Sequence, residues 1–181
     1  MIAYAITDPS TFHFDTLAED MSYFASHADM IVYRDKETKE YDSYAKVFIN
    51  EAKKYPFDKI LLHGSVTLAV ELEADGVHLT SMQFDQIEYA KQNNLFVIIS
   101  THTVEEALRA EASGADMITY SPIFDTPNKG KAKGIDALEA LVKLINIPII
   151  ALGGILTQEQ IDASIGTGAT GFASIRFFLP K

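Results

Sequence analysis

The sequence contains no cysteine. This absence excludes disulfide bonds, thiol nucleophiles and metal sites built from thiolates. The chain also lacks an apolar run of the roughly 18 residues that a membrane-spanning helix requires. Its first residues, MIAYAITDPSTF, lack the basic flank and the long apolar stretch of a signal peptide. We therefore expect a cytoplasmic protein that has no membrane partner.

Positive charge is scarce in this chain. Lys and Arg total 15 against 25 Asp and Glu, which gives a formal net charge of −10. Such an acidic protein does not suit nucleic acid or an anionic membrane as a partner. An anionic ligand would have to meet local positive charge, and one loop supplies it. The stretch SPIFDTPNKGKAKG, residues 121–134, carries Lys129, Lys131 and Lys133.

Short apolar segments recur along the whole chain. Each is rich in Ile, Val or aromatic residues and is apolar throughout, without alternating polar residues. This pattern is typical of strands that are buried on both faces of a parallel sheet. The segments span residues 1–7, 28–34, 59–64, 75–79, 95–100, 116–121, 147–154 and 171–175.

Helical patterns lie between these segments, at residues 14–27, 41–55, 80–94, 101–114, 135–146 and 157–168. Thr80 or Ser81 is the expected N-cap of the third, while Thr103 and Glu106 predict a capping box and Gly114 a C-cap. About eight strands alternating with about seven helices predict one domain, residues 1–181, folded as a compact (β/α)₈ TIM barrel. The alternative, a doubly wound open sheet, needs fewer strands and a glycine-rich turn where this chain has TDPST.

The sequence stops soon after the last predicted strand, so we expect the eighth helix of the barrel to be short or missing. The tail RFFLPK then leaves Phe177, Phe178 and Leu179 with an apolar side to cover. A homodimer contact would cover it, and so would packing of the tail across its own barrel. The residues leave these two alternatives open.

Basic residues gather where the predicted strands end, which is the edge of such barrels that carries the active site. They are Arg34, Lys36, Lys129, Lys131, Lys133 and Arg176. Gly153 and Gly154 follow the seventh strand and offer backbone N–H groups that a phosphate can approach closely. Each feature alone has an ordinary explanation, a solvated loop or a tight turn. Their coincidence at matching strand ends predicts a site for a small phosphorylated ligand.

Three histidines also lie near strand ends: His63, His78 and His102. Histidine is the side chain whose unperturbed pKa lies near neutrality, which suits acid–base chemistry. Because His78 lies within a buried strand, it is expected to be a core residue. His102 precedes a predicted helix and is expected to cap or pack.

Five stretches carry a more specific signal: YRDK (33–36), ADGVHL (74–79), GADMITYSPIFDTPNK (114–129), IIALGGI (149–155) and GATGFASI (168–175). Together, in this order and over nearly the whole chain, they resemble the thiamine-phosphate synthase and thiazole tautomerase family. SPIFDTPNK is similar to that family's Gly-Pro-Ile-Phe-x-Thr-x-x-Lys loop. The resemblance implies a TIM barrel, a role in thiamine biosynthesis and a small phosphorylated heterocycle as ligand.

The family synthase joins a pyrimidine diphosphate to a thiazole phosphate and releases pyrophosphate, through a pyrimidine carbocation. The resemblance implies that Arg34, Lys36 and Lys129 bind the diphosphate, and that Ser100 lies near the pyrimidine and the pyrophosphate. It implies a second set around the thiazole phosphate: Thr126, Gly153, Gly154, Ile175 and Arg176. Arg176 stands where the family usually has serine, and its guanidinium can hold a phosphate more strongly.

Two positions depart from the synthase pattern. Synthases carry Asn-Asp after the third strand and Gly-Gln-x-Asp after the fourth, and both Asp side chains bind magnesium. Here the first pair reads His63-Gly64, and Gln83 takes the second Asp position. Because a glycine and an amide cannot balance Mg²⁺ as two carboxylates do, no metal ligand is expected here. Magnesium is expected only if the synthase reaction holds.

The missing carboxylates are similar to the tautomerase branch, which isomerises a thiazole carboxylate phosphate without a metal. That branch uses a histidine in the loop after the sixth strand, where this chain has Pro122. His63 becomes the candidate acid–base residue because it replaces the family's pocket-facing Asn, and Ser100 and Lys129 are further catalytic candidates. The favoured hypothesis is a diverged, tautomerase-like enzyme. The alternatives are a thiamine-phosphate synthase and a non-catalytic binder of a phosphorylated ligand.

Overall fold

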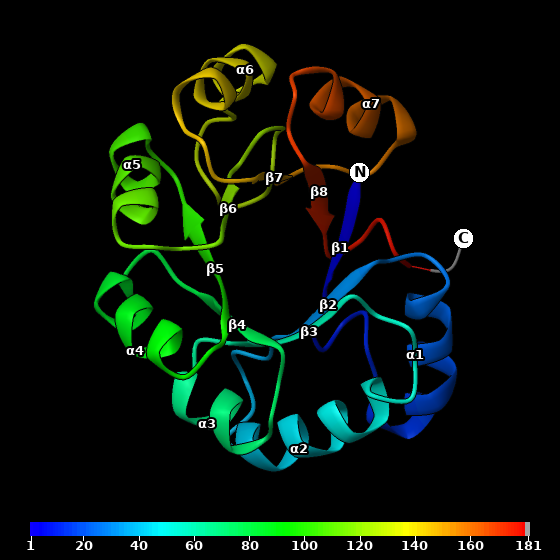
Figure 1. Ribbon diagram of the computed structural model, residues 1–181. Helices are drawn as coiled ribbons and strands as arrows, with labels where there is room; N and C mark the ends of the chain where they lie inside the picture. The colour runs from blue at the N-terminus through cyan, green and yellow to red at the C-terminus, as the bar shows by residue number, and fades with distance from the viewer. Residues whose placement is uncertain (180–181) are drawn as a thin grey trace.

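A computed structural model of the chain describes residues 1–179. Its centre is a closed barrel of parallel strands in sequence order, in which β8 returns to pair with β1 (Figure 1). The strands are β1 Ile2–Ile6, β2 Met30–Tyr33, β3 Lys59–His63, β4 Gly76–Leu79, β5 Phe96–Thr101, β6 Met117–Tyr120, β7 Ile149–Leu152 and β8 Gly171–Ser174. Each predicted segment matches one of them, and only β5 extends beyond its segment, by one residue. The TIM barrel is confirmed, and closure of the sheet rules out the doubly wound alternative.

Helices surround the barrel in Figure 1. They are α1 Leu17–Ala25, α2 Tyr41–Ala52, α3 Val66–Glu71, α4 Ile87–Gln92, α5 Val104–Ala112, α6 Ile135–Leu144 and α7 Gln158–Gly166, with single 3₁₀ turns η1 Phe14–Thr16 and η2 Phe84–Gln86 before α1 and α4. Helix α3 lies in none of the predicted helical ranges, because its buried residues, Val66, Leu68 and Ala69, show no clear helical repeat. Within residues 1–179, no helix has the length and apolar character needed to cross a membrane.

The start of α5 is close to the prediction. The Thr103 side chain accepts a hydrogen bond from the Glu106 N–H at 3.1 Å. The Glu106 carboxylate, however, accepts from the N–H of His102 at 2.5 Å, so the capping box is only half formed. His102 thus belongs to the cap, as expected. Gly114 follows α5 with a left-handed φ of 86°, which suits the predicted glycine.

The predicted N-cap at Thr80 or Ser81 is wrong. Residues 80–83 form a turn that is closed by a 3.0 Å hydrogen bond from the Gln83 N–H to the Thr80 carbonyl. Helical structure begins only at Phe84, in η2. The turn directs the Gln83 side chain toward the end of β3, where it contributes to the site described below.

Side chains of the strands alternate between two cores, because successive residues point to opposite faces of a strand. The outer core fills the space between the strands and the helices. The inner core fills the barrel and consists of Tyr4, Ile6, Met30, Val32, Leu61, Ile98, Met117, Ile150 and Ala173. A residue two positions beyond an inner-core residue therefore points into the mouth of the barrel.

The segment after β8 closes the gap where an eighth helix would lie. It contains no helix up to residue 179 and runs between α7 and α1 in Figure 1. Phe178 is 1% exposed and stacks on Phe172 with 5.8 Å between ring centroids. The Tyr23 hydroxyl donates to the Leu179 carbonyl at 3.3 Å. The tail thus packs on its own barrel, and a homodimer stays a prediction. Residues 180–181 lie outside the described part of the chain.

Candidate active site

Four predicted site residues point into the mouth of the barrel. Each lies two positions beyond an inner-core residue and so shares its inward direction. They are Arg34 after β2, His63 at the end of β3, Ser100 in β5 and Ile175 after β8. Ile175 also packs against the inner core. The structure therefore assembles residues that are up to 141 positions apart in the sequence, since 175 minus 34 is 141.

Three of the predicted cations gather at this mouth. The pKa of Lys36 is lowered by partial burial and by the nearby charges of Arg34 and Lys129. Within residues 1–179, none of the three forms an ion pair with a carboxylate. Unpaired cations that repel one another are stabilised by an anion placed between them. The cluster therefore suits the predicted diphosphate.

The other two lysines of the loop 121–134 have different surroundings. Lys133 places its Nζ 5.3 Å from the ring centroid of Tyr120, a cation–π contact on the outer side of β6. Lys131 is exposed. Lys129 is the lysine of this loop whose charge acts on Lys36. Part of the positive charge that is conspicuous in the sequence thus lies away from the predicted diphosphate site.

His63 is half-buried at the end of β3 beside the cation cluster. Burial and the charges of Arg34 and Lys36 lower the pKa of His63 to about 4. Its backbone is held by Tyr41, whose hydroxyl accepts from the His63 N–H at 3.1 Å. A neutral imidazole at pH 7 can accept a hydrogen bond or a proton, so in the unliganded site His63 is a weak base and not an acid.

Ser100 is connected to the interior through His78. The Nε2 atom of His78 lies 3.0 Å from the Ser100 Oγ, and its Nδ1 lies 2.9 Å from the Tyr4 hydroxyl. His78 is 3% exposed, which confirms the expected core position. Burial, His63 and Arg34 together lower the pKa of His78, which keeps it neutral. Sequence reasoning missed Tyr4, because one tyrosine in an apolar strand gives no functional signal.

The glycine pair after β7 fits tightly against the loop after β6. Gly153 and Gly154 have left-handed φ values of 100° and 69°. A Cβ on Gly153 would lie 2.7 Å from the Cα of Pro122, and a Cβ on Gly154 would lie 2.6 Å from the Asp125 carbonyl oxygen. The Phe124 N–H donates to the Gly153 carbonyl at 3.0 Å. Only glycine allows this close approach of two backbones.

The remaining predicted phosphate residues surround this glycine pair. The Thr126 hydroxyl donates to the Phe124 carbonyl at 3.0 Å, and its oxygen remains able to accept another hydrogen bond. Ser174 accepts from the Phe177 N–H at 3.1 Å and donates to the Ile155 carbonyl at 2.9 Å, which links the loops after β7 and β8. Arg176 lies in the sequence between Ser174 and Phe177, and its side chain is exposed. These residues come from the loops after β6, β7 and β8, whereas Arg34 and Lys36 follow β2.

The positions that carry magnesium ligands in synthases do not fit a cation here. Gly64 has no side chain to offer, and the Gln83 Nε2 donates to the Gly64 carbonyl at 2.8 Å. The Gln83 Oε1 accepts from the Thr80 N–H at 3.0 Å, so both ends of the amide are occupied. Within residues 1–179, no group of three or more His, Asp or Glu side chains is placed to hold a metal ion. We therefore derive no catalytic step through magnesium.

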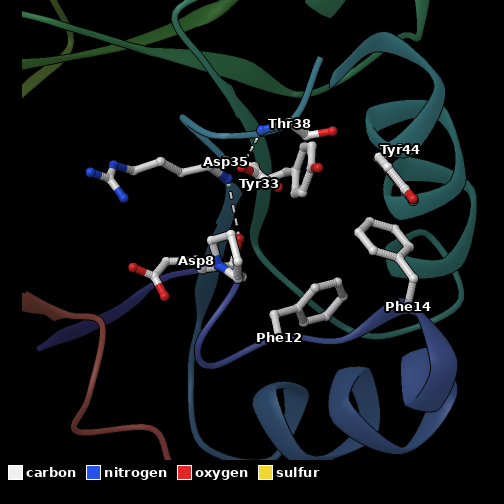
Figure 2. Close-up of a pocket in the computed structure, with 10 residues that line it drawn as sticks. Asp8, Phe12, Phe14, Tyr33, Asp35, Thr38 and Tyr44 are labelled. Carbon is white, nitrogen blue, oxygen red and sulfur yellow. Dashed lines mark hydrogen bonds between the residues drawn. The ribbon is translucent and has the colours of Figure 1, made fainter. Parts of the chain in front are cut away.

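A side pocket of about 250 Å³ adjoins the mouth between the loops after β1 and β2. Figure 2 shows Phe12 and Phe14 from the first loop facing Tyr33 on β2 and Tyr44 on α2. Asp8 lies at its edge, and the Arg34 backbone N–H donates to Thr7 at 3.2 Å. The sequence did not predict this pocket, because its aromatic residues come from segments that meet only in the folded chain.

Comparisons with known proteins are consistent with this geometry. The family model described as thiamine monophosphate synthase matches residues 3–178. The chain is 36% identical over 181 residues to a putative thiamine-phosphate synthase 2 of Aquifex aeolicus (strain VF5), which covers 97% of this chain and 96% of that protein. It is 31% identical to a thiamine-phosphate synthase of Methanocella arvoryzae, over 83% of this chain and 74% of that protein. The solved structure of a thiamine phosphate pyrophosphorylase from Pyrococcus furiosus has a TM-score of 0.82 and 28% identity, over 96% of this chain and 85% of that one.

Proposed function

The chain belongs to the thiamine monophosphate synthase family, and we propose that it joins a pyrimidine diphosphate to a thiazole phosphate at the mouth of its barrel. The observation that carries this proposal is the unpaired cation cluster of Arg34, Lys36 and Lys129 beside His63. A diphosphate carries several negative charges close together, and three neighbouring cations can balance them. The synthase names of the relatives support this alternative over the tautomerase-like hypothesis that the sequence favoured.

In the proposed reaction, the bond between the pyrimidine methylene carbon and the diphosphate oxygen breaks, and its electron pair leaves with pyrophosphate. The carbocation that remains is captured by the lone pair of the thiazole nitrogen. Arg34, Lys36 and Lys129 stabilise the charge that develops on the leaving oxygen, which is the largest electrostatic demand of this reaction. The protein's own cations supply this stabilisation, because Gly64 and Gln83 offer no carboxylate to bind a metal ion.

The second substrate is placed by the loops after β6, β7 and β8. Gly153 and Gly154 give a phosphate close access to the backbone, and Thr126, Ile175 and Arg176 come from loops that contact the glycine pair or follow β8. This arrangement would hold the thiazole phosphate with its ring directed toward Ser100 and the carbocation. Fixing two reactants in one orientation lowers the entropic part of the barrier.

A tautomerase-like reaction is the second candidate, and the Gln83–Gly64 contact favours it. Isomerisation of a thiazole carboxylate phosphate needs a base that removes a proton from one ring position and an acid that returns a proton to another. His63 is neutral at pH 7 and can take such a proton. If it does, His63→Ala abolishes isomerisation while phosphate-ligand affinity stays within a few-fold. A parallel loss of affinity and turnover would refute this role for His63.

The deciding experiment mixes pyrimidine diphosphate and thiazole phosphate with the purified protein, with and without Mg²⁺, and detects thiamine phosphate. Product formation supports the synthase, and loss of product in an Arg34→Ala/Lys129→Ala variant ties it to the cation cluster. A Lys131→Ala variant is the matched control, because it removes one exposed lysine from the same loop. Ligand binding without product in either condition rejects the synthase. It leaves the isomerase or a non-catalytic binder, which an isomerisation assay separates.

A further inference from the structure

Two buried residues hold Ser100 from the interior of the barrel. The Tyr4 hydroxyl lies 2.9 Å from the Nδ1 of His78, and the Nε2 of His78 lies 3.0 Å from the Ser100 Oγ. Tyr4 is 0% exposed, and its ring is 5.7 Å from that of His78 in a stacked arrangement. A continuous chain of three side chains therefore runs from the inner core to the half-buried Ser100 at the mouth.

Counting donors and acceptors in this chain selects one tautomer of His78. If Nδ1 carried the proton, it would donate to the Tyr4 oxygen, and the Tyr4 O–H would have no acceptor within residues 1–179. A buried donor without an acceptor is costly. If Nε2 carries the proton, Tyr4 donates to Nδ1 and Nε2–H donates to Ser100, so each of these groups has a partner. Burial in the barrel disfavours the doubly protonated, charged ring.

The geometry points to Tyr4 and His78 as positioning residues that make Ser100 a hydrogen-bond donor toward the bound ligand. One lone pair of the Ser100 oxygen is occupied by the Nε2–H of His78, which leaves the hydroxyl proton free to point into the mouth. The ligand group that Ser100 meets is then an acceptor, such as a ring nitrogen or a phosphate oxygen. This inference rests on the proposed function only in taking Ser100 to face the ligand.

The first test reads the tautomer of His78 in the unsubstituted protein, and a variant serves only to identify its signals. Long-range ¹H–¹⁵N NMR on histidine-labelled protein distinguishes the two ring nitrogens, and His78→Gln identifies the signals. We expect a neutral ring protonated at Nε2 from about pH 6 to pH 8. A ring protonated at Nδ1, or a charged ring in this range, would overturn the inference.

Tyr4→Phe then removes the donor to Nδ1 and keeps the aromatic ring. We expect His78 to populate both tautomers in this variant. Tyr55→Phe is the matched control, since it also removes one phenol hydroxyl, here one that donates to the Ala18 carbonyl at 3.0 Å. The control is expected to leave the tautomer unchanged. An unchanged His78 tautomer in Tyr4→Phe would show that Tyr4 does not set it.

A double-mutant cycle tests whether Tyr4 acts through Ser100. With thiamine phosphate as the probe, Tyr4→Phe and Ser100→Ala are each expected to raise Kd about fivefold to tenfold, the effect of one lost hydrogen bond. In the Ser100→Ala background, Tyr4→Phe is expected to have no further effect. A full additional effect would assign Tyr4 a merely structural role. If thiamine phosphate does not bind the wild type, the proposed function is rejected, and the tautomer alone decides the inference.

Discussion

Gln83 and Gly64 are joined by a 2.8 Å hydrogen bond from the Gln83 side-chain amide to the Gly64 carbonyl. The resemblance places magnesium carboxylates at both positions in synthases. In this chain the Gln83 amide N–H has the Gly64 carbonyl as its acceptor. The Gln83 Oε1 accepts a 3.0 Å hydrogen bond from the Thr80 N–H. The edge of the mouth between β3 and β4 is therefore neutral.

The neutral pair predicts that divalent cations do not bind at this edge. Calorimetry with Mg²⁺ is expected to show no binding to the ligand-free wild type and a new site in the Gly64→Asp/Gln83→Asp variant. Gly64 has a left-handed φ of 77°, a conformation that Asp and Asn tolerate better than most residues. Gly64→Asn/Gln83→Asn is the control of the same shape without charge. Equal Mg²⁺ affinity of wild type and the double-Asp variant would contradict this interpretation.

The cation cluster predicts unequal effects of the loop lysines. Lys129→Ala is expected to weaken binding of inorganic pyrophosphate at least tenfold, since a charge-assisted hydrogen bond contributes about 1.5–3 kcal/mol. Lys131→Ala and Lys133→Ala are expected to change it less than about twofold, because Lys131 is exposed and Lys133 contacts Tyr120 away from the cluster. Calorimetry at low and high salt measures all three. Equal small effects would show that the loop is only a solvated run of charge.

The low pKa of His63 predicts a loss of stability in acid. Its folded-state pKa of about 4 lies below the ordinary value of 6.5, so the unfolded chain binds the proton more readily. The contribution of neutral His63 is fully present above pH 6.5 and is lost as the pH falls through about 4. The free energy of unfolding should fall over this window by up to roughly 3 kcal/mol from this residue.

Urea denaturation at several pH values measures this effect. A His63→Gln variant should have a flatter pH dependence than the wild type, although His78, whose pKa is also lowered, still contributes with the same sign. Parallel curves for the two proteins would mean that His63 titrates normally in the folded state.

The close contact of Gly153 and Gly154 with the loop after β6 predicts that a side chain at either position destabilises the protein. Gly153→Ala and Gly154→Ala should each destabilise the protein by about 3 kcal/mol or more, because a Cβ would collide with the loop after β6. Gly130→Ala is the matched control. It has a similar left-handed φ of 74° but nothing within 4 Å of the added Cβ, so only the strain of about 1 kcal/mol remains. Chemical denaturation and calorimetry with thiazole phosphate are the measurements, and equal losses in all three variants would refute the packing argument.

Much of the fold could be predicted from sequence because its signals are local. Each strand is a short apolar run that ends where polar residues or glycines begin. The cations at the ends of the second and sixth strands were predictable for the same reason, since every parallel strand ends at the same edge of the barrel. Helix α3 could not be predicted, because its buried residues, Val66, Leu68 and Ala69, show no clear helical repeat.

The amino-acid sequence alone determined the barrel, its family and the residues that follow each strand, because strand propensity and motif order are properties of neighbouring residues. Only the tertiary structure decided which side chains meet across the barrel. Tyr4 and His78 are 74 positions apart, and Gln83 and Gly64 are 19 apart. Their pairing depends on closure of the sheet and on a turn that replaces a predicted helix start. Neither the buried support of Ser100 nor the neutral edge at Gly64 has a local signature, since the first is made by contacts between strands and the second by a contact between the turns after β3 and β4.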